Sequence, residues 1–128
     1  ARVIWEKTLE SDHPYIAAIL NNLGETYWIR GDYEAAEQYF LRSLAIKERV
    51  MPGHPSVAVT LNALANVYRD QERYAEAEPI YRRALSVRQS TLDADDTAIA
   101  ETLKDLAKML RQMGRVAEAE RLEAQIRT

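Results

Sequence analysis

Apolar residues recur with the spacing of a helix in three blocks of the chain. In the first block Leu20, Leu23 and Tyr27 lie three and four residues apart, which places them on one side of a helix. The same stripe begins again at Leu61 and at Leu103, after 41 and then 42 residues. A fixed period in this range predicts a solenoid, in which each unit buries its apolar face only against its neighbours.

Each block contains a second helical segment after a short turn. Gly31 and Gly114 stand in two of these turns, where glycine suits the left-handed residue that ends a helix. Beyond the turns the small residues Ala36, Ala77 and Ala119 recur, and a small side chain lets two helix backbones approach closely. Each unit is therefore predicted to be a pair of helices. The predicted helices span approximately residues 14–30, 33–50, 55–71, 74–91, 97–113 and 116–127, after a helical remnant that ends near residue 10.

The pattern resembles the tetratricopeptide repeat, in which large residues, a Gly or Ala and a Tyr mark the first helix and Ala, an aromatic and a small residue mark the second. The longer period and the linkers that end in His-Pro resemble the variant found in kinesin light chains. Leu110 and Glu123 depart from the pattern, since each replaces an aromatic residue. The resemblance covers roughly Ile4 to Thr128 and implies an all-α, right-handed superhelical solenoid of antiparallel helix pairs. In the first repeat the signature positions are Leu20, Leu23, Gly24, Tyr27, Ala36, Phe40 and Ser43.

We expect the chain to form a single domain, because its 128 residues are one domain's length. Its predicted parts are a remnant of a preceding repeat at 1–12, two repeats at 13–53 and 54–95, and a third repeat with a C-terminal cap at 96–128. These boundaries follow the repeat period and the two longer linkers.

The two ends of the array differ. Trp5 lies one period before Ile46, so the first residues match the last turns of a second helix whose partner helix is absent. We therefore expect the native protein to extend further at its N-terminus. At the other end, Glu123 and Arg127 take positions that are apolar in the first repeat. Because a charge buried there would be unpaired, we expect both side chains to face solvent and the array to stop at a polar helix.

The composition argues against several classes of function. Hydrophobic residues make up 47% and charged residues 29% of the chain, which is enough apolar material for a core. The absence of cysteine rules out disulfides and thiolate metal sites and fits a reducing compartment, so we expect a cytoplasmic location. A net charge of −3 argues against a nucleic-acid partner. No apolar run approaches the roughly 20 residues of a membrane span, so no membrane partner is expected.

No group of residues has the pattern of a catalytic or metal site. His13 and His54 lie one period apart, each just before a proline that begins a helix, and are interpreted as linker or capping residues. Carboxylates near the starts of the second helices, such as Glu37 and Glu78, are expected to face solvent and to suit the helix dipole. The chain has no glycine-rich phosphate loop and no His-Glu-x-x-His motif. We therefore predict no catalytic residues, no metal ligands and no cofactor.

The resemblance implies that the first helix of each repeat lines a concave groove. Asparagine side chains there can donate to and accept from an extended backbone, while lysine and arginine can receive acidic groups. Trp28 is a candidate apolar anchor, although packing on an upstream repeat is an alternative role for it. Cations on a helix surface are also often only solvated. The predicted groove residues are Asn21, Glu25 and Trp28, then Asn62, Asn66 and Arg69, then Lys104, Lys108 and Arg111, with Ala18, Val59 and Glu101 on the same faces.

These observations predict a non-enzymatic protein-interaction module that binds an extended, acidic partner segment in the concave groove. The partner is a protein or peptide, and another part of the same full-length protein is one option. A structural spacer or oligomerisation element is the alternative. It predicts that groove residues tolerate substitution while the ends or the convex face carry assembly.

Overall fold

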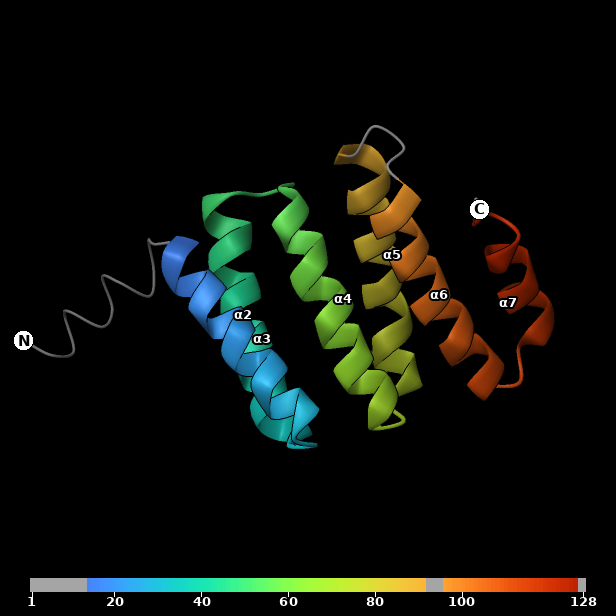
Figure 1. Ribbon diagram of the computed structural model, residues 1–128, viewed down its shortest axis with the longest axis horizontal. Helices are drawn as coiled ribbons and strands as arrows, with labels where there is room; N and C mark the ends of the chain where they lie inside the picture. Colours follow the sequence, from blue (N-terminus) through green and yellow to red (C-terminus); the bar gives the residue numbers. More distant parts are fainter. Residues whose placement is uncertain (1–13, 92–95, 127–128) are drawn as a thin grey trace, which may run out of the picture.

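The computed structural model describes residues 14–91 and 96–126, and all regular structure in these ranges is helical. The helices follow the order expected from the repeat, and their bounds agree with the predicted ones within a few residues (Figure 1). The predicted all-α fold class is confirmed. The helices are α2 (Pro14–Ile29), α3 (Tyr33–Val50), α4 (Pro55–Asp70), α5 (Tyr74–Thr91), α6 (Asp96–Gln112) and α7 (Val116–Glu123).

Neighbouring helices pack as three pairs, α2 with α3, α4 with α5 and α6 with α7, and the pairs follow one another along the long axis (Figure 1). Ala36, Ala77 and Ala119 are completely buried, as expected for residues at the helix crossings. A Cβ atom added to Gly24 would lie 2.7 Å from the ring of Phe40, so this ring packs directly on the backbone of α2. The small positions of the pattern thus set how closely each pair packs.

The apolar stripes of α4 and α6 form the core, but the stripe of α2 is partly uncovered. Leu61, Leu64 and Leu106 are at most 1% exposed, because α3 packs against α4 and α5 against α6. Leu23, predicted to lie in the same buried stripe, is 37% exposed, and Ile19 is 39% exposed. The prediction for Leu23 was therefore wrong, since no helix in the described part of the chain covers this side of α2.

A buried cation joins each repeat to the next. Lys47 Nζ donates to Thr60 Oγ1 at 2.8 Å and to a backbone carbonyl of α4. One period later, Arg88 Nη1 donates to Thr102 Oγ1 at 2.9 Å and to a backbone carbonyl of α6. Both cations are about 5% exposed. Thr60 Oγ1 in turn donates to Asn21 Oδ1 at 2.7 Å. We call Lys47, Thr60 and Asn21 the first joint, and the equivalent residues Arg88, Thr102 and Asn62 the second joint.

Carboxylates of the second helices also connect repeats. Glu37 pairs with Arg73 at 3.0 Å, and Glu78 pairs with Arg115 at 2.7 Å. The hydrogen bond from Arg115 holds the pKa of Glu78 below its usual range. These two glutamates were expected to face solvent near a helix start, and the structure corrects that expectation: each is the partner of an arginine in the following repeat, a contact made only when repeats stack.

The caps and ends agree in part with the sequence where the structure describes them. His54 caps α4, because its Nδ1 accepts a hydrogen bond from the backbone N–H of Ser56 at 3.0 Å. The side chain of Glu123 is 39% exposed and pairs with Arg111 of α6, so the expectation that it faces solvent is met only in part. The predictions for the helical remnant, Trp5, His13 and Arg127 lie outside the described residues.

Candidate functional site

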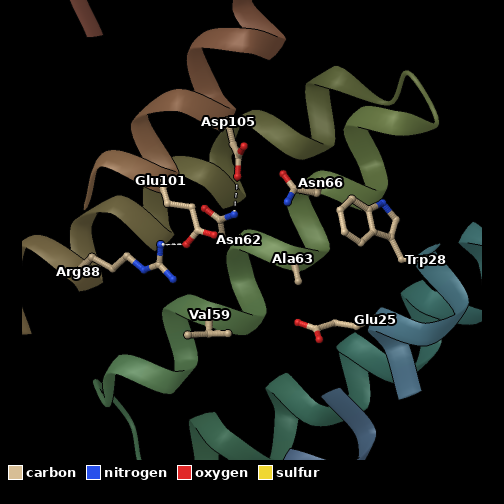
Figure 2. Close-up of a pocket in the computed structure, with 9 residues that line it drawn as sticks. All are labelled: Glu25, Trp28, Val59, Asn62, Ala63, Asn66, Arg88, Glu101 and Asp105. Atoms are coloured by element: carbon tan, nitrogen blue, oxygen red, sulfur yellow. Dashed lines mark hydrogen bonds and ion pairs between the residues drawn. The ribbon is translucent and has the colours of Figure 1, made fainter. Parts of the chain in front are cut away.

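A pocket of about 290 Å³ opens where the first helices of the three repeats face one another. Figure 2 shows α4 in the middle, with side chains from α2 on one side and from α6 on the other. The predicted groove residues Glu25, Trp28, Asn62 and Asn66 all reach it, as do Val59 and Glu101. The complete lining is Glu25, Trp28, Val59, Asn62, Ala63, Asn66, Arg88, Glu101 and Asp105.

Asn62, which lines this pocket, has a buried acceptor without a donor. Its Nδ2 group donates to Asp105 Oδ2 at 2.9 Å, and the residue is 4% exposed. Its Oδ1 atom is buried and has no hydrogen-bond partner among the described residues. A carboxylate can only accept, so Asp105 fixes the amide with its nitrogen toward α6. The unpaired atom is therefore an oxygen that needs a donor.

Asn66 has the opposite orientation, because a chain of hydrogen bonds holds its oxygen. Arg69 Nη1 donates to the hydroxyl of Tyr81, and that hydroxyl donates to Asn66 Oδ1. A guanidinium cannot accept, so the hydroxyl hydrogen must point to Asn66. Burial raises the pKa of Tyr81 well above its usual value, which keeps this hydrogen in place. The Nδ2 group of Asn66 therefore remains as a donor beside the pocket.

Trp28 forms one wall of the pocket. Its indole Nε1 donates to Asp70 Oδ2 at 2.7 Å, which ties α2 to the last turn of α4. The half-buried ring packs against the main core at this junction of the first two repeats. Trp28 therefore lines the pocket at this junction, and its packing on an upstream repeat stays an alternative prediction.

Two predicted groove residues are buried in contacts between helices. Asn21 is 7% exposed and its Oδ1 accepts from Thr60 Oγ1 at 2.7 Å. Arg69 is also 7% exposed and contacts Tyr81 and Asp70, with Asp105 at 3.9 Å. Neither side chain is free to contact a partner without breaking these bonds. The resemblance and the helical spacing placed both on the groove side but did not show how closely the neighbouring helix approaches.

The cations of α6 lie apart from the pocket. Lys104 and Lys108 are exposed, and neither forms an ion pair with any described residue. Arg111 pairs with Glu123, whose Oε1 lies 2.6 Å from Nη2, and this contact raises the pKa of Arg111 and lowers that of Glu123. Within the described ranges, the predicted basic surface therefore consists of two unpaired lysines and one largely neutralised arginine.

The sequence did not point to Arg88 or Asp105 as lining residues. Arg88 lies on a second helix, but it stands one period after Lys47, and an alignment of the second helices would have paired the two cations. Asp105 follows Glu101 by four residues, so helical spacing places both on one side of α6. Both signals were present in the chain.

A family model described as tetratricopeptide repeat matches residues 1–49 and 56–128. The chain belongs to the tetratricopeptide repeat family. No curated protein matches it. Over 98% of the chain, its fold is similar to that of BtubC (BKLC) from P. vanneervenii, with a TM-score of 0.87 and 24% identity.

The repeats are also similar to those of a Podosopora anserina protein proposed to be a kinesin light chain, with nearly identical TPR-like repeats. That match has a TM-score of 0.77 and 25% identity over 97% of this chain, and a variant form of the same protein gives a TM-score of 0.79. The chain spans 50% of the length of BtubC and 59% of the Podosopora anserina protein. These matches confirm a tetratricopeptide solenoid of the kinesin-light-chain-like type.

The described helices have no recognisable group of metal ligands and no membrane-spanning segment. Among the described residues, no group of three or more His, Cys, Asp or Glu side chains has the arrangement of a metal site. None of the helices described has the length and apolar character needed to cross a membrane. Tetratricopeptide repeats generally bind proteins, and polar side chains line the pocket on the first helices of this chain.

Proposed function

We propose that the chain is a non-enzymatic protein-interaction module that holds an extended partner segment along its first helices. The observation that supports this best is the buried, unpaired Oδ1 atom of Asn62. Leaving a buried acceptor without a donor costs about 1–3 kcal/mol, so a partner N–H group placed there recovers free energy that the free protein lacks.

Asn66 supplies the complementary group one helical turn further along α4. Its Nδ2 group can donate to a backbone carbonyl of the partner, while Asn62 accepts from an N–H group. An extended partner segment has free carbonyls for Asn66, because its backbone is not engaged in a helix. The donor of Asn66 and the acceptor of Asn62 can therefore hold a partner segment in one direction.

Lys104 and Lys108 extend the binding surface along α6. Both are exposed, and acidic side chains of the partner segment would lie over them. Exposed charges are screened by salt, so we expect affinity to fall and association to slow as ionic strength rises. Binding is weak and transient on this view, and we place the protein in the cytoplasm.

The test is a set of binding measurements with peptides selected from a random library on the immobilised protein. Lys104→Gln with Lys108→Gln should weaken binding of the acidic peptides by about tenfold, as expected for two lost charge contacts. The matched control, Arg83→Gln with Arg121→Gln, removes the same charge from α5 and α7 and should leave the affinity unchanged.

A second variant tests the asparagine contacts separately. Asn66→Ala removes the donor and should weaken all selected peptides by a similar factor, because it contacts their backbone. Failure of the library to yield any peptide, or equal losses from the groove and control pairs, would contradict the proposal. The structural spacer would then be the better account.

A further inference from the structure

We infer that the pocket between α2, α4 and α6 receives a cationic side chain of the partner segment, a lysine ammonium or an arginine guanidinium. This inference rests on the function proposed above and names the donor that reaches Asn62. It makes the partner a segment of mixed charge, with acidic groups over the lysines of α6 and a cation in the pocket.

The charges around the pocket favour a cation. Glu25 from α2 and Glu101 and Asp105 from α6 line it, against the single guanidinium of Arg88 in this lining. Arg88 is 5% exposed and donates to Glu101 at 2.9 Å, to Thr102 at 2.9 Å and to a backbone carbonyl of α6 at 2.7 Å. Arg88 thus pairs with Glu101, and Asp105 lies 3.9 Å from Arg69, so Glu25 is the lining carboxylate without an ion pair among the described residues. Three carboxylates against one guanidinium leave the lining with a formal net charge of −2.

The unpaired acceptor points to a ligand independently of these charges. Asn62 is 4% exposed, its Oδ1 atom has no partner within the described ranges, and the residue lines the pocket. Asp105 prevents the amide from turning over, since only Nδ2 can donate to a carboxylate. An ammonium or guanidinium carries several N–H donors and can reach this oxygen and a nearby carboxylate together.

Trp28 suits the same ligand. The bond from its Nε1 atom to Asp70 fixes the ring, and Figure 2 shows the ring and Glu25 projecting from α2 toward the Asn62 to Asn66 stretch of α4. A cation over an indole face is attracted by the ring quadrupole, and the alkyl part of a lysine or arginine side chain packs on the same surface. The pocket thus combines an aromatic wall, carboxylates and a buried acceptor.

The direct test is an NMR titration of the protein with N-acetyl-arginine amide and with its neutral isostere, N-acetyl-citrulline amide. The cationic compound should shift the Trp28 indole and Asn62 side-chain amide resonances, and the neutral compound should shift them far less. Glu25→Gln should weaken the response by about fivefold, while Glu34→Gln, an equal charge change at an exposed position of α3, should not. Equal shifts from the two compounds, or equal effects of the two variants, would overturn the inference.

Peptides selected from the random library separate this inference from the proposed function. Replacing a cation of a selected peptide by glutamine should weaken binding to the wild type by about tenfold and binding to Glu25→Gln by much less. Peptides that bind in the groove with no dependence on lysine or arginine would overturn the inference and leave the proposed function standing. Absence of any peptide would contradict the proposed function, and the titration would still decide whether the pocket takes a cation.

Discussion

The two joints between repeats are built from equivalent residues but differ in how their hydrogen bonds end. In the first joint Lys47 donates to Thr60, and Thr60 donates to Asn21 Oδ1 at 2.7 Å. Each of these donors reaches an acceptor, and the asparagine is closed into the structure. This joint connects two repeats and leaves the oxygen of its asparagine unavailable to a partner.

The second joint has the same bond from a cation to a threonine, but its asparagine has a different partner. Arg88 donates to Thr102 as Lys47 does to Thr60, but the asparagine of this joint, Asn62, donates to Asp105. The residue equivalent to Asp105 in the preceding repeat is Ala63, whose side chain has no acceptor to offer. One carboxylate therefore turns an asparagine from a structural residue into one that presents a free acceptor. Equivalent positions in a repeat protein need not share a role.

The largest expected effect concerns the cation of the second joint. Arg88→Met removes the charged donor to Thr102 and to a buried carbonyl, and should lower the free energy of unfolding by about 2–3 kcal/mol. Lys47→Met should cost less, because Thr60 can still donate to Asn21. Guanidinium unfolding midpoints measure both. Arg83→Met, at an exposed position of the same helix, is the control, and a loss as large as that of Arg88→Met would contradict the buried role.

Asp105→Ala should convert the second joint into a copy of the first. Without the carboxylate, Asn62 is free to turn its oxygen toward Thr102, and the pocket loses its unpaired acceptor. We expect binding of the selected peptides to weaken by about tenfold while stability changes little. The Asn62 side-chain amide resonances report the rotation. Unchanged resonances with unchanged affinity would show that Asp105 does not hold the amide.

The reverse change, Ala63→Asp, should open the first joint. A carboxylate at this position competes with Thr60 for Asn21, and loss of the buried bond should cost about 1 kcal/mol. Thermal melts together with the Asn21 amide resonances measure the outcome. If Asn21 stays on Thr60 and the melt is unaltered, the difference between the joints has another cause.

The smallest expected effect is a change of stability with pH, which the lysine of the first joint should cause and the arginine of the second joint should not. Burial lowers the pKa of Lys47 from its usual value of 10.5, and Glu25 only partly opposes this. In the unfolded chain the lysine keeps its proton to higher pH, so between the lowered pKa and 10.5 unfolding takes up a proton and stability rises with pH. Lys47→Arg should remove this rise, because arginine does not titrate in that range. The unfolding midpoints of the wild type and of Lys47→Arg should therefore diverge between neutral and alkaline pH. Parallel curves would show that Lys47 does not cause the rise in stability.

Much of the fold could be predicted because it depends on local pattern. The period places Leu61 and Leu103 at the starts of equivalent apolar stripes, and the buried alanines at the crossings follow from the same alignment. The exposure of Leu23 could not be predicted in this way. Its burial depends on a helix that packs against the outer side of α2, and the residue pattern of α2 says nothing about such a helix. Helix positions and crossing residues depend on the sequence of one repeat, whereas the burial of its outer apolar face depends on the neighbouring repeats.

The candidate site was predicted in part for the same reason. The resemblance to the tetratricopeptide repeat, together with helical spacing, placed Asn62, Asn66, Glu25 and Trp28 in the groove, and all four line the pocket. Asn21 was placed there by the same rule and is closed by a bond to Thr60, which lies 39 residues away. Spacing identifies the face of a helix, but it does not identify the partner of each side chain on that face.

The sequence by itself determined the repeat, the helix bounds, the apolar core and the faces that polar residues occupy, because these depend on periodicity within one helix and on small residues at fixed positions. Tertiary structure alone decided which asparagine is satisfied and what charge the pocket carries. The bond from Asn62 to Asp105 spans 43 residues and exists only when α4 and α6 are stacked. Whether a hydrogen bond forms depends on differences of a few tenths of an ångström in the separation of two helices. The sequence pattern of a single chain does not contain these separations.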